Sequence, residues 1–300
     1  MARVTLLDGG MGQELLARSG DTAAALWATQ VMRDHPGLVA QVHTDYFAAG
    51  ATVATTNSYA IHHDRLTGFG LDDQFGALHA QALAEARAAR TAHGAGARIA
   101  GSLGPLVASY RPDMLPPHAE AVAKYAEIAR LMAPEVDLIL CETVASLAHA
   151  RAVLEGAAVA NLPVWLSVTV DDDDGHCLRS GEPVAALADL PSDAILANCS
   201  APEAMPAALA DFARMGRPFG AYANGFRQTT KDFLNAGTKL ANPTHTCPHT
   251  RPEMTPALYA DHALRWVDQG ATLIGGCCET TPAHIKEIAR RLRAAGHQIC

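Results

Sequence analysis

The sequence has no excess of positive charge and no long apolar run. Lysine and arginine together number 23, against 31 aspartate and glutamate residues, so the formal net charge is -8. It contains neither a basic cluster nor an apolar stretch of about 20 residues, the length needed to span a bilayer. The composition therefore argues against nucleic acid or a membrane as a partner and favours small-molecule substrates.

Cysteine and aromatic residues are also scarce. Seven cysteines in 300 residues, an odd number, fit reduced thiols better than a disulfide framework. The first residues enter a strand pattern at Val4 without the apolar core of an export signal, so we expect a cytoplasmic protein. Aromatic residues make up only 5%, and the prevalence of Ala, Leu and Val is typical of helices packed closely on strands.

The common signatures of nucleotide binding and serine catalysis are missing. The glycines at 94 and 96 precede a predicted strand, whereas the phosphate-binding turn of a dinucleotide fold follows one. There is no Walker loop and no G-x-S-x-G elbow. The glycine-rich turn at 8–12 does follow a predicted strand, and its amides can hold an anion or a carboxylate, but such a turn is not specific by itself.

Short apolar runs bounded by Gly, Pro, Asn or Asp alternate with Ala-rich helical stretches. The predicted strands are 4–7, 52–56, 98–101, 136–140, 164–170, 194–197, 219–223 and 271–274. The predicted helices are 38–49, 74–92, 119–131, 146–159, 183–190, 202–215, 256–269 and 282–294. Eight such units predict a (β/α)8 TIM barrel that forms a single domain over residues 1–300, with a doubly wound open sheet as the alternative.

Two polar segments are interpreted as loops. The segment 225–255 follows the seventh predicted strand, and a loop of this length is usually a functional lid or arm. It contains His245, Cys247 and His249, whose spacing matches no common zinc signature. The acidic run 171–174 is interpreted as a solvated turn and not as a cation site, because nothing nearby supplies matching ligands.

Three cysteines are expected to meet at the barrel rim formed by the carboxyl-terminal ends of the strands, where barrel enzymes place their active sites. Cys277 and Cys278 follow the eighth predicted strand and two glycines that permit a sharp turn, and Cys199 ends the sixth. A disulfide between neighbours is strained, whereas a soft metal accepts adjacent sulfurs. Three thiolates leave one tetrahedral position open, as in catalytic zinc sites. The alternative for Cys199 is a small buried hydrophobe, which we prefer for Cys141.

The other predicted strand ends are unusually polar, which makes their residues candidates for substrate binding. These candidates are Asp8, Gly9, Asn57, Tyr59, Ser102, Glu142 and Asn224. The carboxylates Asp8 and Glu142 could act either as a general acid/base pair or as the group that binds a substrate ammonium. Asp8 could also cap a turn. An alternative role for Asn57 and Ser102 is that of ordinary turn residues without contact to a substrate.

The ordered set of motifs at these strand ends resembles the homocysteine S-methyltransferases. The motifs are D-G-G-M-G-Q-E-L at 8–15, T-N-S-Y at 56–59, G-S-L-G-P at 101–105, E-T at 142–143, N-C-S at 198–200 and G-G-C-C at 275–278. The resemblance implies a zinc-dependent barrel that moves a methyl group from an onium donor to homocysteine and gives methionine. It also implies that Cys199, Cys277 and Cys278 bind zinc, and that Asp8, Gly9 and Glu142 hold the amino-acid end of homocysteine.

Some residues depart from the family pattern where the donor binds. Thr143 stands where the betaine-using branch has an aromatic residue, which favours a sulfonium donor such as S-methylmethionine or S-adenosylmethionine. The segment 106–113 also differs, and Tyr59, with Phe226 or Tyr110, is a candidate to face the cation. The alternatives are a betaine donor, selenocysteine or another thiol as acceptor, and a non-catalytic zinc-binding or thiol-sensing barrel.

Overall fold

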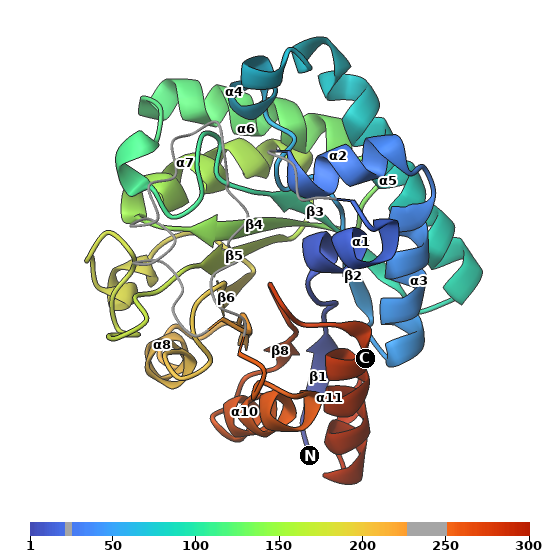
Figure 1. Ribbon diagram of the computed structural model, residues 1–300. Helices are drawn as coiled ribbons and strands as arrows, with labels where there is room; N and C mark the ends of the chain where they lie inside the picture. The colour runs from blue at the N-terminus through green and yellow to red at the C-terminus, as the bar shows by residue number, and fades with distance from the viewer. Residues whose placement is uncertain (22–25, 227–250) are drawn as a thin grey trace.

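Eight parallel strands form a closed ring in the computed structural model, which describes residues 1–21, 26–226 and 251–300 (Figure 1). The strands are β1 (Arg3–Leu6), β2 (Val53–Thr55), β3 (Arg98–Leu103), β4 (Leu138–Val144), β5 (Val164–Val168), β6 (Ala194–Asn198), β7 (Phe219–Tyr222) and β8 (Leu273–Ile274). Their order around the sheet is β2-β3-β4-β5-β6-β7-β8-β1. A parallel bridge between Leu7 and Val53 joins β1 to β2, so the ring closes. The predicted (β/α)8 barrel is therefore confirmed, and the open-sheet alternative is wrong.

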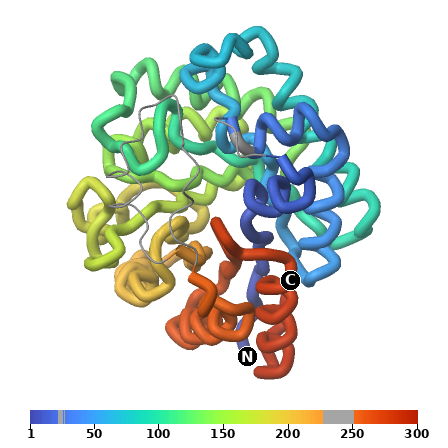
Figure 2. Tube along the Cα trace, in the orientation of Figure 1, coloured from blue at the N-terminus to red at the C-terminus, as the bar shows by residue number. Residues whose placement is uncertain are grey.

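Helices surround this ring on the outside (Figures 1 and 2). They are α1 (Met11–Ser19), α2 (Trp27–Asp34), α3 (Leu38–Ala49), α4 (His63–Leu66), α5 (Phe75–His93), α6 (His118–Met132), α7 (Leu147–Ala157), α8 (Met205–Phe212), α10 (Pro256–Asp268) and α11 (Pro282–Ala294). Within the described ranges, no helix is long and apolar enough to cross a membrane.

The structure differs from the predicted elements in three places. The predicted helix 183–190 is only a 3-10 turn at Val184–Leu187, because Pro183 and Pro191 bracket a segment too short for a regular helix. Helices α1, α2 and α4 lie in parts of the chain where no helix was predicted, since each has fewer than ten residues. A ninth strand, β9 (Gln298–Ile299), pairs with β1 outside the ring.

Alternate residues along the strands fill two separate cores. One cluster contains inward-facing side chains from the seven strands β2 to β8 and from Leu7, which follows β1, and the other packs the outward-facing side chains against the helices. Because both faces of the strands are buried, the strands read as continuous apolar runs in the sequence. Tyr222 belongs to the inner cluster, and Cys277 packs against that cluster. The core inside the barrel is therefore in direct contact with residues of the candidate site.

Candidate metal and substrate site

The sulfur atoms of Cys199, Cys277 and Cys278 lie together at the carboxyl-terminal rim of the barrel. The sulfur of Cys199 is 2.9 Å from that of Cys277 and 3.8 Å from that of Cys278, and all three lie within 4.8 Å of one another. Sulfurs bound to one tetrahedral zinc ion are about 3.8 Å apart, given zinc–sulfur bonds of about 2.3 Å. The trio therefore matches the donor set of a soft metal after a shift of about 1 Å or less.

Hydrogen bonds within the trio separate the acidities of its three thiols. The bonds from Cys277 and Cys278 lower the pKa of Cys199. The bonds with Cys199 raise the pKa of Cys277 and of Cys278. A divalent cation in this position would replace the remaining thiol protons and leave three thiolates.

Unusual backbone conformations are concentrated on this rim. Of the five non-glycine residues with positive φ in the described chain, four lie here: Tyr110 at 61°, Thr143 at 56°, Cys199 at 51° and Glu279 at 63°. Such residues cost free energy and persist only where their surroundings fix them. The buried side chain of Asn198 does this for Thr143: its Oδ1 accepts from the Thr143 amide, and its Nδ2 donates to Thr143 Oγ1, each at 3.0 Å. Asn198 therefore ties the end of β4 to the end of β6.

The loop after β8 is fastened to the loop after β1. The hydroxyl of Thr280 donates to the carbonyl of Cys277 at 2.5 Å, and the amide of Gly10 donates to the carbonyl of Thr280 at 2.9 Å. A Cβ atom at Gly276 would meet the side chain of Thr280, and one at Gly9 would lie 2.9 Å from the Thr280 carbonyl. Both glycines are therefore required for the close approach that places the cysteine pair.

Two buried carboxylates, Asp8 and Glu142, lie at the ends of β1 and β4. Ser102 and Tyr222 donate hydroxyl groups to Glu142 at 2.6 and 3.0 Å, and the amide and hydroxyl of Thr55 donate to Asp8 at 2.7 and 2.9 Å. Burial is the main cause that raises the pKa of each carboxyl to about 7, and the charge of Glu142 contributes to the rise at Asp8. Within the described residues, neither carboxylate pairs with lysine or arginine. The pair is therefore suited to receive a cationic group from a ligand.

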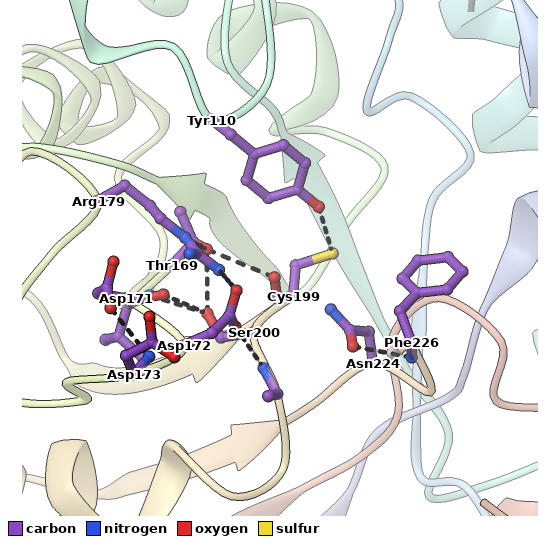
Figure 3. A network of polar contacts seen from close by, with 12 residues as sticks. Tyr110, Thr169, Asp171, Asp172, Asp173, Arg179, Cys199, Ser200, Asn224 and Phe226 are labelled. Carbon is purple, nitrogen blue, oxygen red and sulfur yellow. Dashed lines mark hydrogen bonds and ion pairs between the residues drawn. The ribbon is translucent and has the colours of Figure 1, made fainter. Parts of the chain in front are cut away.

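The remaining sequence candidates divide into two groups. Asn224 is buried, and its Nδ2 has no acceptor within the described part of the chain, while its Oδ1 accepts from the Phe226 amide at 3.1 Å (Figure 3). Asn57 instead donates to the carbonyl of Ala28 at 3.1 Å and so contacts α2. The hydroxyl of Tyr59 lies 2.7 Å from Ser109 Oγ. The side chains of Asn57 and Tyr59 are thus engaged by neighbouring parts of the protein.

Three contacts at the site were not foreseen from the sequence, although Tyr110 itself was a candidate to face the donor cation. Tyr110 donates its hydroxyl to the sulfur of Cys199 at 3.0 Å, and Tyr222 reaches Glu142 from inside the barrel (Figure 3 shows the former). Asp172 pairs with Arg179 at 2.9 Å and accepts from the amide of Ala201 at 2.9 Å. The side chain of Arg179 is 5% exposed, so the interpretation of the acidic run as solvated is wrong for Asp172. No sequence signal reveals these partners. The contacts of Tyr110 and Asp172 depend on how loops fold back, and that of Tyr222 depends on which residues of β7 face the barrel interior.

Two other expectations concern cysteines away from the trio. Cys141 is a free, fully buried thiol, and burial raises its pKa well above the usual range, as expected for a small apolar core residue. Residues 227–250, which include His245, Cys247 and His249 and most of the predicted lid, lie outside the described residues.

The fold and site define a (β/α)8-barrel protein with a cysteine cluster able to bind a metal. The family model for homocysteine S-methyltransferase matches residues 5–292, so the chain belongs to that family and is a methyltransferase. It is 34% identical to the homocysteine S-methyltransferase of Escherichia coli K12 over 96% of this chain and 95% of that one. It is 28% identical to homocysteine S-methyltransferase YbgG of Bacillus subtilis, over 96% and 94% of the two chains. Among solved structures, the metallated form of the Escherichia coli homocysteine methyltransferase MmuM matches with a TM-score of 0.78 and 30% identity over 96% of both chains.

Proposed function

We propose that this protein is a zinc-dependent enzyme that transfers a methyl group from a sulfonium donor to the thiol of homocysteine and forms methionine. The observation that carries the proposal is the convergence of Cys199, Cys277 and Cys278 within 4.8 Å. We further propose that residues 1–300 act as a single barrel domain. Family membership and the metallated form of a relative support this function.

The three sulfurs suit zinc because thiolates are soft ligands and three of them leave one tetrahedral position open. When bound, zinc would hold the homocysteine sulfur as a thiolate at neutral pH, where a free thiol is mostly protonated. We propose a cytoplasmic location, because a reducing compartment keeps the protein thiols available.

The protein's own residues would hold the amino-acid end of homocysteine. The carboxylates of Asp8 and Glu142 are both buried and repel each other, so a substrate ammonium between them would relieve that repulsion. Ser102 keeps Glu142 oriented, and Gly9 lets the loop that carries Asp8 lie close against Thr280. Among the residues that the structure describes, the Nδ2 of Asn224 has no acceptor, so it would donate to a substrate oxygen. Fixed in this way, the acceptor sulfur is presented to the donor in one orientation.

Tyr59 and Asn57 would act indirectly, since their polar groups already bond to Ser109 and to the backbone of α2. A sulfonium donor is favoured because Thr143, whose hydroxyl accepts from Asn198, provides no aromatic ring for a quaternary ammonium. S-Methylmethionine and S-adenosylmethionine are the two candidates.

A panel of donors tested with homocysteine separates the alternatives. We expect S-methylmethionine or S-adenosylmethionine to give methionine, measured by mass spectrometry, at a higher rate than betaine. The same donor tested with selenocysteine and other thiols identifies the acceptor. If no donor gives a methylated product while the protein still binds zinc, the chain is a non-catalytic thiol-binding barrel and the proposal is wrong.

The KM for homocysteine is expected to rise as the pH falls below about 7. Only the ionised forms of Asp8 and Glu142 attract an ammonium group, and burial places the pKa of both at about 7. Lowering the pH from about 8 to about 6 should therefore raise KM by about tenfold or more. The Glu142→Gln variant, measured across the same range, should show a shallower dependence. Equal slopes in the two proteins would contradict this role of the carboxylate.

A further inference from the structure

Tyr110 reaches over the rim to one particular sulfur. Its phenol oxygen lies 3.0 Å from the sulfur of Cys199 and donates to it (Figure 3). Tyr110 belongs to the segment between β3 and α6, and its φ of 61° is in the left-handed region. A non-glycine residue adopts this conformation only where the surrounding structure fixes it. The loop is thus held in an unfavourable conformation that delivers the hydroxyl to Cys199.

The contacts that fix this loop come from the segment after β2. The guanidinium of Arg65 donates to the carbonyl of Pro105 from Nε at 3.1 Å and from Nη2 at 2.7 Å. The hydroxyl of Tyr59 lies 2.7 Å from that of Ser109, the residue before Tyr110, and Arg65 also lies over the Tyr59 ring at 5.6 Å. Since these groups hold both ends of the stretch 105–109, the position of Tyr110 is defined by the fold.

The chemistry of the proposed site creates a need for such a contact. With homocysteine bound, four thiolates would surround one zinc ion: the substrate sulfur and the sulfurs of Cys199, Cys277 and Cys278. Each is a nucleophile toward a sulfonium donor. A hydrogen bond donated to a thiolate stabilises its negative charge and so makes that sulfur less reactive than one without a donor. The enzyme must therefore direct the methyl group to the substrate sulfur and away from its own.

We propose that Tyr110 is a positioning residue that protects Cys199 from methylation by the enzyme's own donor. This inference rests on the proposed function. In the side reaction, a lone pair of the Cys199 thiolate forms an S–CH3 bond, the bond between that methyl carbon and the sulfonium sulfur breaks, and the donor leaves as a neutral thioether. The S-methylcysteine that results has lost its negative charge and is a poorer zinc ligand. Protection therefore preserves the metal site over many turnovers.

The test measures methylation of the protein itself. Zinc-loaded wild-type protein and the Tyr110→Phe variant are incubated with S-methylmethionine or S-adenosylmethionine, whichever supports methionine formation, in the absence of homocysteine. Peptides are then analysed by mass spectrometry for the added methyl group. Removal of a hydrogen bond to a charged sulfur should make methylation of Cys199 about tenfold faster in Tyr110→Phe. The peptide that contains Cys277 and Cys278 serves as the internal reference and should change little.

Matched variants separate this role from a structural one. Tyr222→Phe removes a phenol hydroxyl from the same site that donates to Glu142, so its Cys199 should be methylated at the wild-type rate. Ser109→Ala removes the partner of Tyr59 but keeps the Tyr110 hydroxyl, and we expect an intermediate rate. If Tyr110→Phe loses zinc or fails to fold, Ser109→Ala takes its place as the test.

The possible outcomes distinguish the two proposals. Selective methylation of Cys199 in Tyr110→Phe supports the protective role. Equal rates in wild type and Tyr110→Phe, or an equal rise at all three cysteines, would overturn it while leaving the proposed function intact, provided that the wild type methylates homocysteine. Failure of the wild type to methylate homocysteine with either donor would overturn the proposed function and this inference with it.

Discussion

Replacement of Cys277 by serine is expected to abolish zinc binding and to lower kcat/KM for homocysteine by at least about 10³-fold. Serine keeps the size of the side chain but supplies no thiolate, so two sulfurs, those of Cys199 and Cys278, would remain. Without the metal, the homocysteine thiol is mostly protonated at neutral pH, as a free cysteine thiol with a pKa of about 8.5 is, and it is no longer held in position. Elemental analysis of the purified variant and steady-state kinetics measure the two losses.

The control for this variant is Cys177→Ser. Cys177 lies in the turn after β5, where its sulfur contacts Asp174 at 3.4 Å, and it is not a member of the trio. We expect this variant to keep both the metal and the activity. A Cys277→Ser protein that retains a full complement of zinc and full activity would refute the assignment of the trio.

Glutamine in place of Glu142 is expected to raise the KM for homocysteine by about 10²-fold while leaving the zinc content unchanged. Glu142 is buried and accepts hydrogen bonds from Ser102 and Tyr222, so its carboxylate is held ready for the substrate ammonium. The amide is close in size but carries no charge, and it has an NH2 donor group in place of one of the two acceptor oxygens. Kinetics at about pH 8, where the wild-type carboxyl is ionised, give the largest contrast.

Tyr222→Phe provides a graded comparison. It removes one of the two hydroxyl donors to Glu142 but leaves the carboxylate in place, so a rise in KM of about threefold to tenfold is expected. The rise in KM should therefore be larger for Glu142→Gln, which loses the charge, than for Tyr222→Phe, which loses one hydrogen bond to it. An unchanged KM in Glu142→Gln, or loss of zinc from it, would show that Glu142 does not act on the substrate ammonium.

The barrel could be predicted from the sequence because each of its eight strands is a short apolar run buried on both faces. Such runs are visible without knowledge of the fold, and their alternation with longer helical stretches indicates the topology. The segment 183–190 was predicted as a helix from its alanines and leucines, although its two flanking prolines limit it to a 3-10 turn. Helix α1 was not predicted because it is short and begins directly after a glycine-rich turn.

The central part of the site could also be predicted, for a simple geometric reason. Cys199, Cys277, Asp8 and Glu142 all stand at or just beyond the carboxyl end of a strand, and a parallel barrel brings these ends to one rim. The residues that support them could not be predicted in this way. Tyr110 reaches Cys199 across a sequence separation of 89 residues, from a loop whose conformation depends on other loops. Spacing along the chain carries no information about such a contact.

The most direct test of the account is X-ray absorption at the zinc edge, with and without homocysteine. The three cysteines predict three sulfur ligands at about 2.3 Å in the free enzyme and a fourth sulfur after homocysteine is added. A zinc ion with fewer than three sulfur ligands, or a sulfur count that does not change when homocysteine binds, would contradict the account.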